Sequence, residues 1–208
     1  MRLSYPIASF IFLFIGGQIL AQSNEECIQN LSIFAEFAKV KNYDSAYEPW
    51  EKVRVECPKL NVAIYSYGEK ILQNKIKNSS GAEQEAFKNT LIELYQAWGD
   101  NFPTRKGKNR IGSILSSKAQ SLLDFKIGSK MEAYQTFDKA FIEDPNSFTN
   151  PKRLYNYFKT LFDLYKAGDQ GVTMEQLFNK YEEVSEKFEV ESIKLAKNLD
   201  KILKKEES

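Results

Sequence analysis

The chain has no histidine among its 208 residues, and this limits the chemistry that its side chains can do. Histidine is the usual general base near neutral pH, the commonest metal ligand, and a member of every Ser-His-Asp and Cys-His catalytic arrangement. Paired carboxylates can still hydrolyse glycosides, and Glu93, Asp124 and the Glu182-Glu183 pair are available. Each of these also fits a solvated helix face. We therefore predict a protein that is not an enzyme, with no catalytic residue and no cofactor, and keep a hydrolase without histidine as an alternative.

A basic segment, residues 104–110, is the next candidate, because it packs four positive charges into seven positions. A helix start offers unpaired backbone N–H groups, so this loop could hold an anionic ligand at the start of the helix that follows. It lacks the order of glycines and lysine that a phosphate-binding loop needs. A solvated, mobile loop is the other interpretation.

The two cysteines, Cys27 and Cys57, are too few to hold a metal without histidine, so no metal site is predicted. If Lys41-Asn42-Tyr43 is the turn of a helical hairpin, Cys27 lies 15 residues before Asn42 and Cys57 lies 15 after it. Both then stand at the same height on antiparallel helices. We predict a disulfide between them, and two separate buried thiols are the alternative.

The N-terminal residues 1–22 have the features of a secretory signal peptide. Arg2 is their single charge, residues 7–20 are almost wholly apolar, and Ala21-Gln22 precedes a polar stretch. An uncleaved membrane anchor is the alternative, but the apolar stretch is shorter than the roughly 20 residues that span a bilayer. We expect export to the periplasm or the outside of the cell, where an oxidising environment permits a disulfide.

The charge balance argues against polyanions as general partners. The chain has 29 basic and 28 acidic residues, and removal of residues 1–22 takes away one arginine, which leaves 28 of each. A chain without net charge has little general attraction for nucleic acid, so no nucleic acid partner is predicted. No later apolar run is long enough to span a membrane, so no span is expected after signal removal. Residues 23–208 are enough to bury one continuous core, so we expect them to form one solenoid-like helical repeat domain.

A pattern of small, aromatic, small and proline residues organises this segment. It occurs at Ala46, Trp50, Val53 and Pro58, and it recurs with the same spacing at Ala133, Phe137, Ala140 and Pro145. Weaker copies lie at Leu91, Tyr95, Trp98 and Pro103, and at Leu177, Tyr181, Val184 and Glu189. On a helix the first three positions share one face, and the proline ends the helix. A repeat period of 42 to 45 residues is typical of stacked helical hairpins.

The fold class that follows is all-α, a helix-hairpin solenoid with a long final helix. We place its units at approximately 25–58, 60–103, 109–145 and 150–208. Pro49 inside the second helix of the first unit predicts a kink, or a late start near Ser45. Asn150-Pro151 predicts a helix start, and Thr173 with Gln176 predicts a capping box for a final helix of up to about 30 residues.

Residues 31–58 resemble the tetratricopeptide repeat. The family's turn is matched at Lys41-Asn42-Tyr43 and its second-helix signature at Ala46, Trp50 and Pro58, whereas Phe34 stands where the family has a small residue. The period is longer than the family's 34 residues and closer to that of HEAT-type hairpins. Together with the predicted signal peptide, the resemblance implies an exported bacterial protein of tetratricopeptide type. The residues expected to pack the repeats are Ala46, Trp50, Pro58, Gly68, Ala133, Phe137, Ala140 and Pro145.

The resemblance also implies a concave groove, lined by the first helix of each pair, that binds an extended peptide or a partner protein of the cell envelope. The first-helix residues expected to face this groove are Glu69, Gln73, Tyr155, Asn156 and Lys159. The tyrosines could instead be core residues with their hydroxyls at the rim. We expect an exported scaffold for protein interactions.

The final helix carries an apolar stripe that is longer than any helix in the chain that could pair with it. Such a stripe should pack on a copy of itself, on another subunit or on further repeats. A self-associating envelope structural protein is therefore the second functional hypothesis. A frayed, solvated tail at Lys204-Lys205-Glu206-Glu207 is the remaining alternative.

Overall fold

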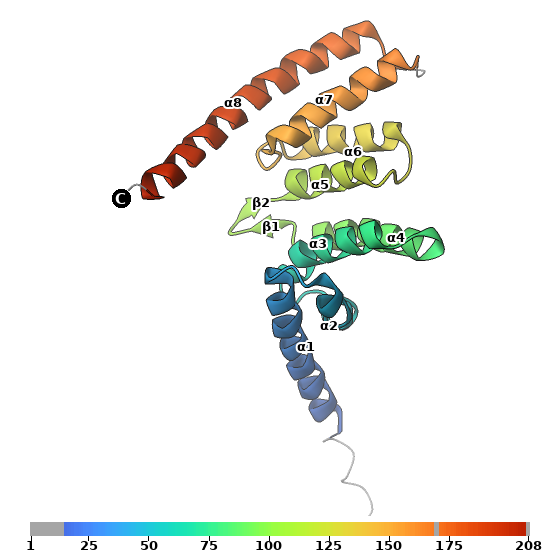
Figure 1. The fold of residues 1–208 in the computed structure, drawn as a ribbon, viewed down its shortest axis with the longest axis vertical. Coiled ribbons are helices and arrows are strands. Elements are labelled where there is room, and N and C mark those ends of the chain that lie inside the picture. The colour runs from blue at the N-terminus through green and yellow to red at the C-terminus, as the bar shows by residue number, and fades with distance from the viewer. Residues whose placement is uncertain (1–14, 169–170, 207–208) are drawn as a thin grey trace, which may run out of the picture. The chain divides into compact units, whose positions relative to one another are not determined.

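The computed structural model of the chain describes residues 15–168 and 171–206, and the side chains of residues 25–168 and 171–201. This part is all-α apart from one short hairpin of two strands (Figure 1). The chain divides into two compact units, Met1–Asn78 and Ser79–Ser208, which are described in turn. Residues 1–14 of the predicted signal peptide lie outside the described residues.

The first unit contains α1 (Ile15–Lys39), α2 (Tyr43–Glu56) and α3 (Ala63–Asn78). The side chain of Asn42, in the predicted turn, accepts a hydrogen bond from the backbone N–H of Ser45 at 3.2 Å and so caps α2. Of the two outcomes predicted for Pro49, a kink or a late start near Ser45, the late start is not found, because α2 begins at Tyr43 and continues through Pro49. The cap and the buried face of the helix outweigh the one hydrogen bond that the proline removes.

The packing of α2 on α3 depends on close contact between the Trp50 ring and the backbone at Gly68. Trp50 is fully buried, and its indole Nε1 donates to the carbonyl oxygen of Ile64 at 2.7 Å. A Cβ at Gly68 would lie 2.6 Å from that Nε1, so no larger residue fits under the ring. Ala46 is also fully buried. Trp50 and Gly68 thus pack α2 on α3, and Pro58 follows α2, with its carbonyl accepting from the Tyr65 hydroxyl at 3.0 Å.

The predicted disulfide is confirmed, since Cys27 on α1 and Cys57 at the end of α2 are bonded, with Cα atoms 6.3 Å apart. Cys27 is buried beside Phe34 and Ala38, which form the inward face of α1. Phe34 is fully buried although the tetratricopeptide pattern has a small residue there. Its ring packs edge-on against Tyr67 of α3.

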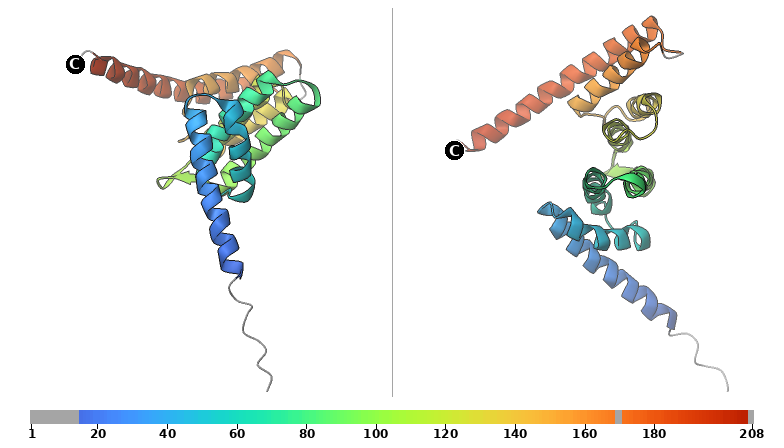
Figure 2. Two further views of the ribbon diagram at one scale, coloured as in Figure 1. Left: turned by 60° about the horizontal axis from the view of Figure 1, so that its bottom comes forward. Right: turned by 45° about the vertical axis from the view of Figure 1, so that its right-hand side comes forward.

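The second unit contains five helices and a hairpin. Its elements are α4 (Gly81–Asn101), β1 (Thr104–Arg105), β2 (Lys108–Asn109), α5 (Ile111–Asp124), α6 (Lys130–Glu143), α7 (Pro151–Lys166) and α8 (Met174–Glu206). Consecutive helices of this unit lie side by side, and α5 also contacts α7 (Figure 2). The first helices of the last two hairpins, α5 and α7, are therefore neighbours, as stacked hairpins require.

The close contact between α5 and α6 needs a glycine at the start of α5. A Cβ at Gly112 would lie 2.0 Å from the carbonyl oxygen of Asp144, which directly follows α6. The buried Asp144 carboxylate accepts from the Gly112 N–H at 3.2 Å, and the Ser147 hydroxyl accepts from the Ser113 N–H at 2.9 Å. The loop after α6 thus caps α5 and holds it against α6.

The core of the second unit is aromatic. Ala133, Phe137 and Ala140, the best second copy of the repeat pattern, are all fully buried on α6. Phe137 stacks on Phe148 with ring centroids 5.9 Å apart, and it lies at the same distance from the Tyr157 ring. Pro145, which was also expected to pack the repeats, is instead exposed, because it lies in the loop after the end of α6. Two helices, α6 and α7, and the loop between them therefore share one cluster of rings.

A half-buried polar cluster ties α8 to α6 and α7. The Tyr157 hydroxyl donates to Asp138, and the ammonium of Lys180 pairs with the same carboxylate at 3.1 Å. That ammonium also lies 5.6 Å from the Tyr157 ring centroid. Burial raises the pKa of Tyr157, and the hydrogen bond to Asp138 raises it further. The hydroxyl therefore stays protonated and remains a donor.

Both helix starts predicted for the last hairpin are confirmed. The Asn150 side chain accepts from the Arg153 N–H at 3.1 Å, with Pro151 in the first turn of α7. Thr173 and Gln176 make the two reciprocal hydrogen bonds of a capping box, 3.0 and 3.1 Å long. Local capping chemistry fixes where these helices begin.

No helix among the described residues has the length and apolar content needed to cross a membrane.

Replacing both cysteines by alanine should lower the free energy of unfolding by about 3 to 4 kcal/mol, because the bond closes a loop between residues 30 apart. Urea denaturation followed by circular dichroism measures this loss. Dithiothreitol should destabilise the wild-type chain by a similar amount and leave the double variant unchanged. Equal stability of the wild-type chain with and without reductant would contradict the prediction.

Gly112→Ala should destabilise the second unit by about 2 to 3 kcal/mol, because the new methyl group overlaps a backbone oxygen that cannot rotate away. Gly99→Ala is the matched control in the same unit, since its Cβ would meet nothing closer than 3.7 Å. That change should stabilise α4 by about 0.5 to 1 kcal/mol through helix propensity. Thermal unfolding of both variants measures the two changes in stability. Equal midpoint temperatures for the two variants would contradict the prediction.

Candidate functional site

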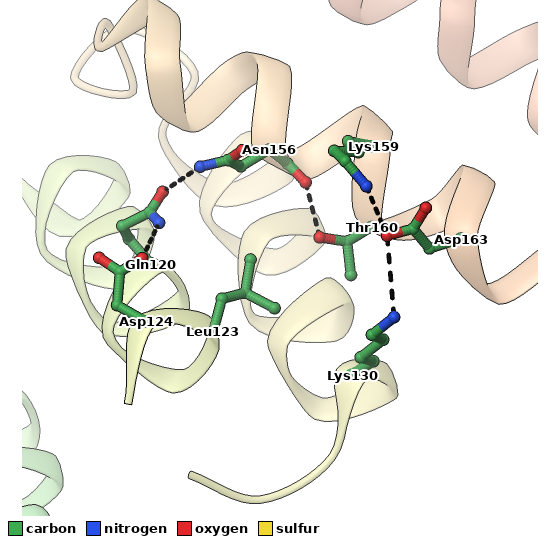
Figure 3. A pocket seen from close by; sticks show the side chains of 8 residues that line it. All are labelled: Gln120, Leu123, Asp124, Lys130, Asn156, Lys159, Thr160 and Asp163. Atoms are coloured by element: carbon green, nitrogen blue, oxygen red, sulfur yellow. Dashed lines mark hydrogen bonds and ion pairs between the residues drawn. The ribbon is translucent and has the colours of Figure 1, made fainter. Parts of the chain in front are cut away.

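A polar pocket of about 200 Å³ lies where α5, the start of α6 and α7 meet (Figure 3). The side chains that line it are Gln120, Leu123 and Asp124 of α5, Lys130 of α6, and Asn156, Lys159, Thr160 and Asp163 of α7. Because α5 and α7 are the first helices of successive hairpins, the pocket is on the side of the unit where the sequence analysis placed a binding groove. All of its residues belong to the second unit.

At one end of the pocket, two carboxamide side chains and a carboxylate form a chain of hydrogen bonds. Asn156 Nδ2 donates to Gln120 Oε1 at 2.7 Å, and Gln120 Nε2 donates to Asp124 Oδ1 at 2.8 Å (Figure 3). The acceptor and donor roles of both amides are thereby fixed. Within the described residues, the Asn156 side-chain oxygen has no hydrogen-bond donor, so it is available to a ligand N–H.

The other end of the pocket is charged. Asp163 Oδ2 lies 2.7 Å from the Lys159 ammonium and 3.7 Å from the Lys130 ammonium. The hydrogen bond from Lys159 lowers the pKa of Asp163, and the same bond raises the pKa of Lys159. Two cations thus share one carboxylate, and this end keeps one unit of positive charge. Asp124, at the carboxamide end, supplies a negative charge.

The pocket wall between these ends is held by the α7 backbone. The Thr160 hydroxyl donates to the Asn156 carbonyl oxygen at 2.6 Å, and Thr160 is buried. Leu123 is the one apolar side chain among the lining residues. The pocket therefore offers amide, hydroxyl and ionic groups, and little apolar surface.

Two of the five residues predicted to face a partner are in this pocket, namely Asn156 and Lys159. Tyr155 is next to them on α7 but is 57% exposed and does not line the pocket. Glu69 and Gln73 are on α3, in the first unit, where the Gln73 amide donates to the Glu69 carboxylate at 3.5 Å. The structure thus brings together one pair of the predicted residues and places the others on separate surfaces.

Six lining residues were not singled out as partner-binding by the sequence. They are Gln120, Leu123, Asp124, Lys130, Thr160 and Asp163. A signal for three of them existed, because Thr160 and Asp163 are one helical turn from Asn156 and Lys159, and Gln120 is one turn from Asp124. The contact between Asn156 and Gln120 joins residues 36 apart in sequence and requires the tertiary fold.

The carboxylates considered for catalysis are dispersed. Glu93 is exposed on α4, and Glu182 and Glu183 are exposed on α8, where Glu183 pairs with Lys180 at 2.9 Å. Asp124 alone lines the pocket. Among the described residues, no three Cys, Asp or Glu side chains are grouped closely enough to hold a metal ion.

The basic segment 104–110 forms the β1–β2 hairpin, with Lys106 and Gly107 at positive φ in its turn. The α5 N–H groups that could have bound an anion have protein partners. The Asn109 side chain accepts from the Ile111 N–H at 3.0 Å, and the Gly112 and Ser113 N–H groups are taken by the loop after α6. These backbone N–H groups at the start of α5 are therefore not available to bind an anion. The side chains of residues 104–109 are exposed.

Comparison of the chain with family models, with curated proteins and with solved structures finds no match. The interpretation of the site therefore depends on its own geometry and chemistry.

Lys159→Ala should raise the pKa of Asp163, because the variant loses the shortest cationic contact of that carboxylate. Lys130→Ala should raise it less, since that ammonium is 3.7 Å away rather than 2.7 Å. NMR titration of the Asp163 carboxyl measures both shifts. The charged form of Asp163 is the one stabilised, so this small contribution to folding is present above its ordinary pKa and is lost on acidification. The reverse order of the two shifts would contradict the geometry.

Proposed function

We propose that this protein is an exported scaffold that binds an extended segment of a partner protein of the cell envelope in the pocket between α5 and α7. The observation that carries the proposal is the pocket itself, in which Asn156 and Lys159 meet the Gln120 and Asp124 side chains. The stacked hairpins on either side support it, since such folds bind peptides along the first helix of each pair.

The chemistry of the pocket suits a polypeptide backbone with charged side chains. The free Asn156 oxygen is an acceptor for a peptide N–H, as the amides of an extended chain require. The excess positive charge at Lys130 and Lys159 suits an acidic side chain of the ligand, and Asp124 suits a basic one. We infer a ligand segment that carries both signs of charge.

Export is supported by two features. The apolar residues 7–20 precede a polar stretch, and Cys27 and Cys57 are bonded in a disulfide of the kind that persists in oxidising compartments. The proposed place of action is the periplasm or the cell surface.

A self-associating structural protein is the second candidate. Several large apolar side chains of α8 are more than a third exposed, among them Phe178, Tyr181 and Leu199. This surface does not include the pocket, so the two functions are compatible.

Selection of extended peptides from a random library on the full chain tests the scaffold proposal. Lys159→Ala should lower the affinity for the selected peptides by about tenfold, because one charge-assisted contact contributes about 1 to 2 kcal/mol to binding. Lys139→Ala is the matched control, since Lys139 is also an exposed lysine with a carboxylate four residues on, but it lies on α6 outside the pocket. Isothermal calorimetry gives the affinities, and thermal unfolding checks that both variants remain folded.

Selected peptides that bind the Lys159→Ala and Lys139→Ala variants equally well would contradict the proposal, as would a library that yields no binder at all.

A further inference from the structure

The last helix is much longer than the helix it packs against. α8 has 33 residues and α7 has 16, which correspond to lengths of about 50 and 24 Å. α8 therefore continues beyond the end of α7, as Figure 1 and the right-hand view of Figure 2 show. A lone helix end in water should be polar on all sides, and this one is not.

Six of the eight large apolar side chains exposed on the described part of α8 follow a heptad pattern, and Val190 and Ile193 lie outside it. Starting at Met174, positions separated alternately by four and three residues form one stripe along the helix, which we call the α8 seam. Its members are Met174, Phe178, Tyr181, Ser185, Phe188, Ser192, Leu195 and Leu199. The six apolar members are between 39% and 63% exposed. A 4-3 repeat of this kind is the seam of a two-stranded coiled coil.

The α8 seam is distinct from the face that joins α8 to the rest of its unit. That face carries Leu177, Val184 and Glu191, which are all buried and spaced seven residues apart. The Glu191 carboxylate is paired with the ammonium groups of Lys187 and Lys194, both at 2.9 Å. α7 thus occupies one side of α8 and leaves most of the adjacent seam open to solvent. The Tyr181 ring also contacts Phe158 of α7, with the ring centroids 5.6 Å apart.

The charges of α8 are separated along its length. Residues 174–192 contain six acidic and two basic residues, and residues 193–206 contain five basic and two acidic residues. Two copies side by side in parallel would bring like-charged halves together. Two antiparallel copies bring the acidic half of each helix beside the basic half of the other, so this distribution is complementary to itself in one orientation only.

We propose that the α8 seam pairs with the seam of a second copy of this chain as an antiparallel two-stranded coiled coil. In the register that sets Phe188 opposite Ser192 of the second copy, Ser185 faces Leu195 and Tyr181 faces Leu199. Each bulky residue near the centre then meets a small one, which is how a close-packed interface avoids both voids and overlap.

The same register is symmetric about one point of the seam. Phe188 and its partner positions lie on either side of the two-fold axis, so every contact occurs twice, as in an isologous dimer. This pairing does not involve the pocket between α5 and α7, and it stands independently of the scaffold function.

Analytical ultracentrifugation of the full chain at several concentrations tests the pairing. The wild-type chain should form a dimer. The variant Leu195→Glu/Leu199→Glu should remain a monomer up to concentrations at least tenfold above those at which the wild-type chain dimerises. Ile142→Glu is the control, because Ile142 is equally apolar and 68% exposed but lies on α6. That variant should dimerise as the wild-type chain does.

Disulfide cross-linking tests the orientation. A mixture of Ser185→Cys and Leu195→Cys chains should give a cross-linked heterodimer under mild oxidation, whereas neither variant alone should cross-link. Parallel copies would cross-link Ser185→Cys with itself, and that result would overturn the proposal.

Other occupants of the seam give other results. If a different part of the same chain covers it, the chain is a monomer at every concentration and Leu195→Glu/Leu199→Glu lowers its melting temperature. If nothing covers it, the chain is a monomer and that variant melts like the wild type. Either result overturns the proposal, as does a dimer that survives the double substitution.

Discussion

The helices of this protein approach one another so closely that certain positions have no room for a methyl group, and the rest of the structure depends on that approach. In the first unit the constraint is Gly68 beneath the Trp50 ring, where an added Cβ would lie 2.6 Å from the indole nitrogen. In the second unit it is Gly112 against the carbonyl oxygen of Asp144. At both places a hydrogen bond accompanies the contact, from Trp50 to the Ile64 carbonyl and from Gly112 to the Asp144 carboxylate. Helix spacing and helix orientation are therefore set together.

This spacing also determines what the opposite faces of the helices can do. With α6 and the ring cluster around Phe137 holding α5 and α7 on one side, the polar residues of α5 and α7 meet on the other side. The hydrogen bond from Asn156 to Gln120 joins α7 to α5, and the packing of the two helices holds its donor and its acceptor in place. A polar pocket built in this way is rigid before any ligand arrives, which reduces the ordering cost of binding. The charge pairs at its rim are exposed and contribute more to orientation and selectivity than to stability.

Much of the fold could be predicted from sequence because its signals are local. The small and aromatic residues at Ala133, Phe137 and Ala140, the cap at Asn150 and the capping box at Thr173 each act within one or two helical turns. The disulfide followed from symmetry about a turn. Three features could not be predicted in this way. Pro49 was expected to kink α2 or to delay its start, but the Asn42 cap fixes the start at Tyr43. Tyr181 matched the repeat pattern yet is 56% exposed, because Leu177 and Val184 take the inward positions beside it. The full pocket needs pairs 36 residues apart, which no periodicity reveals.

The central claim, that close contact between a ring and a glycine sets the helix packing, is tested most directly by a double-mutant cycle on Trp50 and Gly68. The free energy of unfolding is measured for Gly68→Ala, for Trp50→Leu and for the two changes together. Gly68→Ala should cost about 2 to 3 kcal/mol when Trp50 is present and less than about 1 kcal/mol when leucine has replaced the ring, because the overlap has then been removed. A cost that is the same in both backgrounds would show that the two residues do not constrain each other, and it would contradict this account of the fold.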